Sequence, residues 1–283
     1  MSLTQRFGLA FFTNNKVRLH YYTYGNGPEA MLAFHGFGMK GTQFSVLENA
    51  FSERYTIYSF DLFFHGQTEL IDDSLGVIRK GVSSSEFGGY MAEFIQKMDF
   101  QKVSLLSYSM GALMALSVIE SIPVLVDNAF FIAPDGIRPN KLLQFGSGNK
   151  IMNRIFYKLV YSPKTVQFIL NSLFKYGYID DSLHRILQGE FGTVATRLTC
   201  YQAITYHANL RFKPNKLAAI INKNQINTYF YFGETDRLFP PSIGHEFSAM
   251  LENTSLYILN TGHELVNKNL GEFITQQFSV NHA

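Results

Sequence analysis

The residue best placed to act as a nucleophile is Ser109, in the stretch Ser-Tyr-Ser-Met-Gly at 107–111. An apolar run precedes this stretch and a helical pattern follows it, so Ser109 falls on a tight turn between a predicted strand and a predicted helix. Such a turn pushes the serine Oγ clear of the sheet, provided that small residues two positions away let strand and helix approach. Gly111 meets this requirement, and Ser107 stands where glycine is usual. An ordinary turn with a capping serine is the alternative.

A serine nucleophile needs a base to take its proton, and three histidines follow the second run of predicted strands. His245 falls within a predicted helix, and His282 lies in the C-terminal tail. His263 follows the last predicted strand, from which it can reach over the carboxyl edge of a sheet. We therefore expect His263 to be the base, with an ordinary surface histidine as the alternative interpretation.

The histidine in turn needs a carboxylate that fixes its tautomer and stabilises the imidazolium. Asp236 lies three residues beyond Gly233, in the loop after the preceding predicted strand. Glu234 is the nearest rival for this role, and Asp135, after another predicted strand, is a more distant one. The chain order Ser109, Asp236, His263, with each residue after a strand, favours Asp236 because parallel strands gather such loops at one edge.

The elements that would position these residues follow an alternating pattern of strands and helices. Predicted strands cover 17–25, 29–36, 55–63, 102–109, 127–134, 225–233 and 255–260, and predicted helices cover 84–98, 110–122, 241–251 and 264–278. This alternation predicts βαβ crossovers and a mostly parallel sheet that is flanked by helices on both faces.

The pattern is interrupted by a basic, aromatic segment without predicted strands. We therefore expect one α/β core domain, formed by 1–137 and 214–283, and an inserted helical subdomain at 138–213. Residues 138–216 hold twelve Lys and Arg but three acids, a net charge of +9, against −7 for the remainder. Several apolar residues of the insertion are candidates to line a substrate pocket or to pack the insertion onto the core: Met152, Phe156, Tyr157, Phe168, Phe174, Tyr176 and Tyr178.

Composition narrows the class of protein. With 46% hydrophobic and 16% charged residues, the 283-residue chain is typical of a globular protein rather than a disordered one. The single cysteine, Cys200, excludes an intrachain disulfide. The N-terminal apolar run is too short for a signal peptide, and no stretch approaches the ~20 apolar residues that span a bilayer. We expect a cytoplasmic protein that binds no nucleic acid, and its oligomeric state is open.

At these residues the chain resembles the α/β-hydrolase family over nearly its whole length. The matching stretches are HGFG (35–38), DLFFHGQTE (61–69), SYSMG (107–111), GETDRLFP (233–240) and GHELV (262–266). The insertion comes where this family usually carries its helical cap. Two stretches depart from the family pattern, since D-x-x-G-x-G-x-S is more usual than DLFFHGQT and glycine is usual at Ser107.

The resemblance implies a serine hydrolase without a cofactor, in which the backbone amides of Phe37 and Met110 bind the oxyanion. Serine at the elbow argues against dehalogenases and epoxide hydrolases, which use Asp there, and the lack of Trp argues against haloperoxidases. The expected activity is hydrolysis of a small-molecule ester with an apolar acyl or aryl group. Hydrolysis of a thioester or a C–C bond, and a non-catalytic small-molecule receptor, are the alternatives.

A different activity would follow if the glycine loop held a dinucleotide. Gly36, Gly38 and Gly41 spell G-x-G-x-x-G after a predicted strand, and Asp61 lies 20 residues beyond the last of them. This interpretation leaves the serine, histidine and aspartate without a role, so we do not favour it. A zinc hydrolase is also disfavoured, because Asn267 stands where the H-E-x-x-H motif needs its second histidine.

Overall fold

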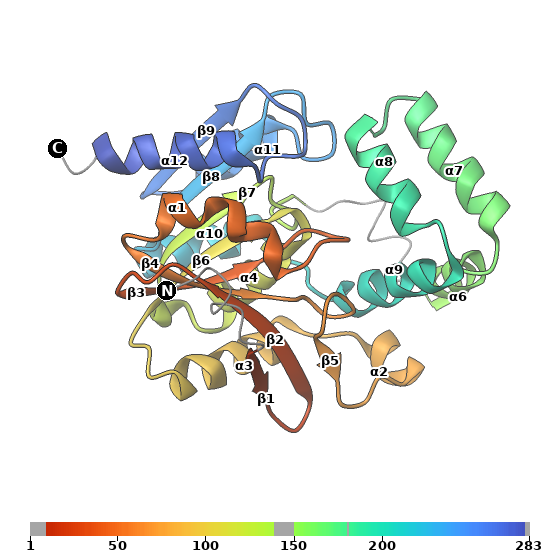
Figure 1. Cartoon of the computed structure of the whole chain (residues 1–283), viewed down its shortest axis with the longest axis horizontal. Coiled ribbons are helices and arrows are strands. Elements are labelled where there is room, and N and C mark those ends of the chain that lie inside the picture. Colours follow the sequence, from red (N-terminus) through yellow and green to blue (C-terminus); the bar gives the residue numbers. More distant parts are fainter. Residues whose placement is uncertain (1–9, 139–149, 180, 281–283) are drawn as a thin grey trace, which may run out of the picture.

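The computed structural model describes residues 10–138, 150–179 and 181–280, with one nine-stranded sheet at the centre of the molecule (Figure 1). Its strands are β1 (Ala10–Thr13), β2 (Val17–Tyr24), β3 (Glu29–Phe34), β4 (Tyr55–Phe60), β5 (Glu69–Leu70), β6 (Val103–Tyr108), β7 (Val126–Ile132), β8 (Asn227–Gly233) and β9 (Thr254–Leu259). Their order across the sheet is β1-β2-β4-β3-β6-β7-β8-β9, and β5 pairs with β2.

The sheet is mixed but mostly parallel, which confirms the predicted fold class. Strands β4, β3, β6, β7, β8 and β9 run parallel to one another, whereas β1, β4 and β5 pair with β2 in the antiparallel sense. Every residue of β6 is buried, as expected for a central parallel strand covered on both faces. The loops after β3, β6, β7, β8 and β9 therefore all open at the carboxyl edge of the sheet.

Helices cover both faces of the sheet and extend beyond it. They are α1 (Glu48–Phe51), α2 (Leu75–Lys80), α3 (Ser84–Lys97), α4 (Ala112–Ser121), α6 (Lys150–Leu159), α7 (Pro163–Lys175), α8 (Asp181–Glu190), α9 (Val194–His207), α10 (Pro214–Lys223), α11 (Pro241–Ser248) and α12 (Lys268–Val280). Side chains of α3, α4, α10 and α11 form one hydrophobic core with the sheet, and those of α1 and α12 form the other.

Local sequence explains the helices that position the site. Helix α3 begins with a capping box, in which Ser83 accepts from the amide of Glu86 and the Glu86 carboxylate accepts from the amide of Ser83. Helix α4 is buried from Ala112 to Ile119, so packing on β6 and α3 holds it at the end of the central strand.

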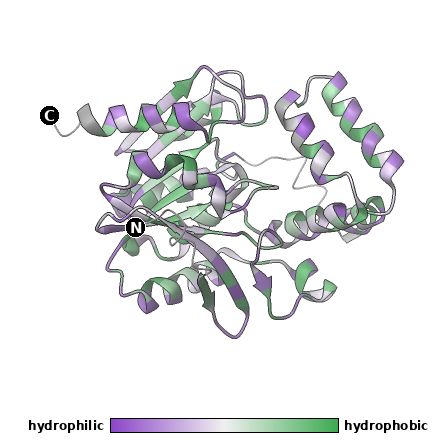
Figure 2. Cartoon of the chain, in the orientation of Figure 1, coloured by the Kyte–Doolittle hydropathy of each residue, from purple (hydrophilic) through white to green (hydrophobic). Residues whose placement is uncertain are grey.

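Helices α6 to α9 lie between β7 and α10 in the chain, and α7 and α8 stand apart from the sheet (Figure 1). Hydrophobic residues are concentrated in the sheet, whereas hydrophilic and hydrophobic residues alternate along α7 and α8 (Figure 2). The end of α9 is joined to the core, because the carbonyl of Tyr206 accepts from the amide of Val82 at 2.8 Å. Among the described helices, none has the length and apolar character that crossing a bilayer requires.

The predicted strands and helices all occur, within a few residues of their expected bounds. Strands β1 and β5 and helices α2 and α10 were not expected from the sequence. Strand β5 has two residues, too few for a periodic pattern, and β1 is a four-residue edge strand held by its pairing with β2. Tertiary pairing rather than local sequence therefore produces these edges.

Candidate active site

Ser109 lies at the turn between β6 and α4, in a strained backbone conformation. Its φ is 50°, in the left-handed region that side chains other than glycine rarely adopt. Gly111 is required for the turn, since a Cβ there would lie 2.0 Å from the carbonyl oxygen of Phe34 in the neighbouring strand. Ser107 fits at the other critical position because its small side chain is fully buried, with Oγ 3.4 Å from the carbonyl oxygen of Phe130.

The loops that carry Asp236 and His263 follow the neighbouring strands β8 and β9 and are bonded to each other. The amide of Thr235 donates to the carbonyl of Thr261 at 3.1 Å. Gly233 lets the loops approach, because a Cβ at this position would lie 2.2 Å from the carbonyl oxygen of Gly262. Backbone contacts thus fix the separation of the aspartate and the histidine.

The three predicted side chains lie in one hydrogen-bonded line. Nδ1 of His263 is 2.8 Å from Oδ2 of Asp236, and Nε2 is 3.1 Å from Oγ of Ser109. A carboxylate can only accept, so Nδ1 carries the proton and Nε2 offers a lone pair to the serine hydroxyl. This arrangement can deprotonate Ser109 as its oxygen attacks an electrophile.

The surrounding residues hold Ser109, His263 and Asp236 in place and keep them largely from water. Ser109, Asp236 and His263 are 7%, 2% and 4% exposed. The second oxygen of Asp236 accepts from the amides of Leu238 and Phe239 at 2.9 and 3.0 Å. These bonds to backbone N–H groups fix the orientation of the carboxylate.

The histidine is held from its other side by an aromatic side chain. The hydroxyl of Tyr108 donates to the backbone carbonyl of His263 at 2.9 Å, and the two rings lie 5.3 Å apart. Tyr108, the residue next to Ser109, therefore also holds His263 in position.

The other residues considered for these roles lie elsewhere. Glu234 and His245 are exposed, and His282 lies outside the described residues. Asp135 is closer to the site, because its amide donates to the carbonyl of Ser109 at 3.1 Å, and its carboxylate accepts from the amide of Gly136. Burial raises the pKa of Asp135 to about 6, against the opposing effect of that amide and of His263.

The two amides expected to bind an oxyanion have no acceptor within the described part of the chain. The amide of Met110 lies at the start of the helix that follows Ser109, where N–H groups lack intrahelical partners. In the loop after β3 the amides of Gly36 and Gly38 donate to side chains, whereas that of Phe37 has no acceptor among the described residues. Phe37 and Met110 are thus available donors on either side of Ser109.

Asp61, which a dinucleotide site would need for a ribose, is used by the protein itself. Its carboxylate accepts from the amide of Gly41 at 2.8 Å and from that of Gln67 at 2.9 Å, and lies 2.7 Å from Nδ1 of His20. It is 1% exposed. The G-x-G-x-x-G stretch is therefore bonded to its own aspartate, which argues against a nucleotide in this loop.

Comparison with known proteins identifies the family of the chain. Residues 29–268 match the family model described as the alpha/beta hydrolase fold, which is most of the chain. The chain belongs to the α/β-hydrolase fold family.

Similarity to individual members of the family is low. An uncharacterized hydrolase of Bacillus subtilis, YugF, is 23% identical over 93% of this chain and 96% of its own length. An uncharacterized protein of Mycobacterium tuberculosis is 26% identical over 46% of this chain, and the match spans about a third, 36%, of that protein. A thermophilic esterase of Thermogutta terrifontis superposes with a TM-score of 0.69 at 13% identity, covering 99% of this chain and 100% of its own. The matched family identifies the chain as a hydrolase of the α/β fold.

The structure explains the departure from the family pattern in the stretch 61–68. Phe64 stands where the family has glycine, and it adopts a φ of 65°, the left-handed conformation that suits glycine. Its ring packs against Tyr206 of α9 at 5.6 Å. Position 66 has the glycine of the family pattern, because the carboxylate of Asp61 lies where a Cβ would be. Phe64 therefore holds the left-handed conformation that suits glycine, at the cost of backbone strain.

The apolar residues expected at a pocket or a packing face divide into two groups. Phe156 and Tyr157 pack on the buried ring of Tyr201, at 5.3 and 5.1 Å. Phe168, Phe174, Tyr176 and Tyr178 are exposed, so for these residues packing onto the core was the wrong interpretation. Helical periodicity predicted an apolar face here, but not whether that face is turned toward the core or toward solvent.

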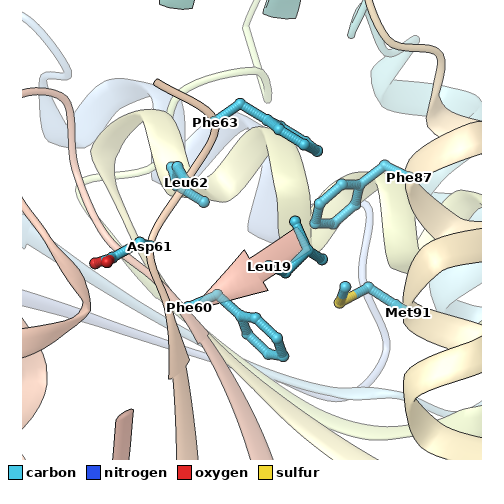
Figure 3. A pocket seen from close by; sticks show the side chains of 7 residues that line it. All are labelled: Leu19, Phe60, Asp61, Leu62, Phe63, Phe87 and Met91. Atoms are coloured by element: carbon cyan, nitrogen blue, oxygen red, sulfur yellow. The ribbon is translucent and has the colours of Figure 1, made fainter. Parts of the chain in front are cut away.

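A small cavity lined by side chains of β2, β4, the loop after β4 and α3 is too small for an organic ligand. It measures about 10 Å³ and is lined by Leu19, Phe60, Asp61, Leu62, Phe63, Phe87 and Met91 (Figure 3). The Asp61 carboxyl points away from the apolar side chains in this view. In the described residues, no group of three His, Cys, Asp or Glu side chains is placed to share a metal ion.

Proposed function

We propose that this chain is a serine hydrolase that cleaves carboxylic esters through an acyl-enzyme on Ser109. The observation that carries the proposal is the continuous line from Asp236 through His263 to Ser109, with bonds of 2.8 and 3.1 Å. The strained elbow and the unpaired amides beside it support the same activity.

In the proposed mechanism, Nε2 of His263 removes the proton of Ser109 as Oγ attacks the ester carbonyl. The amides of Phe37 and Met110 donate to the oxyanion, and Asp236 stabilises the imidazolium. The imidazolium then protonates the leaving alcohol. Water, deprotonated by the same nitrogen, attacks the acyl-enzyme and releases the acid.

We further propose that residues 138–213 act as a cap domain over this site. Two contacts support this. The Glu190 side chain, at the end of α8, lies so close to Gly38 that a Cβ there would be 2.9 Å from its Cδ. The guanidinium of Arg237, next to Asp236, donates to the carbonyl of Gly177 at 3.1 Å. The insertion thus touches both the oxyanion loop and the acid loop, where it can select small-molecule substrates by the shape of their acyl group.

The test is hydrolysis of p-nitrophenyl esters of graded acyl length by the wild type, Ser109→Ala and Ser107→Gly. We expect the wild type to be active, Ser109→Ala to lose ~10⁶ in kcat, and Ser107→Gly, which introduces the usual family residue, to retain activity. No ester hydrolysis by the wild type, or equal rates in the wild type and Ser109→Ala, would overturn the proposal. Turnover of thioesters alone would move the assignment to thioester hydrolysis.

A further inference from the structure

The amide of Phe37, which has no acceptor among residues 10–138, 150–179 and 181–280, lies between two amides that are held by side chains from other segments. The amide of Gly36 donates to Oε1 of Gln43 at 3.1 Å. The amide of Gly38 donates to Nε2 of His65, also at 3.1 Å. The loop therefore leaves one N–H available between two that are fixed.

His65 is held in the tautomer that this bond requires. Its Nδ1 donates to the carbonyl of Phe63 at 2.9 Å, which leaves Nε2 as an acceptor. Burial lowers the pKa of His65, so the ring stays neutral. The titratable groups around it include His35, whose ring lies 5.2 Å away, His207 and the acidic Asp61. The Glu190 side chain lies beside Gly38, whose amide His65 holds.

The turn that carries His65 is costly to form, which indicates a specific purpose. Phe64, the preceding residue, has a φ of 65°, and such strain in a bulky residue collects at functional sites. Gly66 follows with a φ of 56° and no room for a Cβ. Asp61, at the start of the turn, also accepts from the amide of Gly41 and so joins the turn to the oxyanion loop.

Gln43 reaches the loop from the opposite direction. It lies in a 3₁₀ helix, η2 (Gly41–Leu47), whose residues Phe44 and Leu47 are fully buried. The backbone N–H of Gln43 also donates to the carbonyl of Lys40 at 2.9 Å. The acceptor for Gly36 is therefore attached to a packed element.

We propose that Gln43 and His65 are positioning residues that aim the Phe37 amide at the reacting carbonyl oxygen. They fix the two neighbouring peptides and touch no substrate themselves. The inference rests on the proposed function, because an oxyanion forms only if Ser109 attacks a carbonyl. An oxyanion donor works at 2.7–3.1 Å from the developing charge, and a misplacement of ~1 Å costs ~10²-fold in rate.

The test compares variants that remove each acceptor with variants that keep one. His65→Leu and Gln43→Met remove the acceptor at similar volume, whereas His65→Gln and Gln43→Glu retain one. We expect the first pair to lose about 10- to 100-fold in kcat with KM unchanged, and the second pair to recover most of the rate. Equal losses in kcat in His65→Leu and His65→Gln, and in Gln43→Met and Gln43→Glu, would overturn the assignment. A change confined to KM would also overturn it.

Hydrogen–deuterium exchange of the peptide covering 35–41 separates this inference from the proposed function. We expect faster exchange in His65→Leu and Gln43→Met than in their acceptor-keeping counterparts, with the core strands unchanged. Absence of that difference overturns the positioning role even if ester hydrolysis is found. A wild type that hydrolyses no ester overturns the proposed function, and faster exchange in that case still supports the two residues as the anchors of the loop.

Discussion

The carboxyl edge of the sheet and the outer helices of the insertion differ in how firmly the fold holds their side chains. At the edge, Ser109, Asp236 and His263 are almost fully buried and hydrogen-bonded to one another. On α7, Phe168 is 73% exposed, and the exposed Lys164 forms no ion pair within the described residues. Hydrogen bonds and burial together fix the side chains at the sheet edge. A substitution there should therefore reduce activity or stability far more than a substitution on the outer helix.

After loss of the nucleophile itself, the largest effect is expected from Asp236→Asn. The introduced amide would donate to Nδ1 of His263 and place the ring proton on Nε2, facing Ser109, so that the serine could not be deprotonated. We expect a ~10⁴-fold loss in kcat without unfolding. Glu234→Gln, two residues away and exposed, is the matched control and should leave kcat unchanged. Comparable losses in both variants would contradict the assignment of the acid.

A stability effect is expected from Gly111→Ala at the elbow. The added methyl would lie 2.0 Å from the carbonyl oxygen of Phe34, which must shift. We expect unfolding free energy to fall by about 3 kcal/mol or more, as for severe overpacking. Gly89→Ala is the control, since nothing lies within 4 Å of its Cβ position, and it should gain up to ~1 kcal/mol in helix α3. Urea unfolding measures both, and similar results would show that the elbow is not tightly packed.

A pH-dependent effect is expected from Asp135→Asn. The pKa of Asp135 is raised from 3.8 to about 6 by burial, so the unfolded chain releases this proton at lower pH than the folded protein. The folded state therefore loses stability as pH rises between about 4 and 6. We expect Asp135→Asn to be more stable relative to the wild type at pH 7 than at pH 4. A stability difference that is the same at both pH values would contradict a raised pKa of the Asp135 carboxyl in the folded protein.

The smallest effect is expected on the outer helix. Phe168→Ser should change unfolding free energy by less than about 0.5 kcal/mol, because the ring is mostly in water. Leu170→Ser, two residues along the same helix and 5% exposed, should lose at least ~2 kcal/mol. A large loss in Phe168→Ser would mean that this face is covered, and the contrast with the sheet edge would then fail.

The sequence predicted which three residues the structure brings together, because their positions depend on strand order. Ser109, Asp236 and His263 each follow a strongly apolar strand, and parallel pairing brings such loops to one edge whatever the details of packing. Strand order left Glu234, in the same loop, as a rival for the acid, and the structure shows that its side chain is exposed.

The support of the oxyanion loop could not be predicted in this way. Gln43 and His65 bond to amides 7 and 27 residues away, and such contacts leave no periodic signal. Phe64 in a left-handed conformation gave no signal either, because a bulky residue there breaks the usual rule. The direction of Phe168 depended on which face of α7 meets the core, and amphipathic spacing alone does not supply that information.

The most direct test of the account is covalent labelling with a fluorophosphonate, a reagent that reacts with activated serines, followed by intact-mass measurement and peptide mapping. We predict one phosphonyl adduct per chain, on Ser109, at wild-type level in Ser107→Ala and absent in Ser109→Ala. Labelling should fall sharply in Asp236→Asn, since the base then carries its proton on the wrong nitrogen. No adduct in the folded wild type, or an adduct that persists in Ser109→Ala, would contradict Ser109 as the nucleophile.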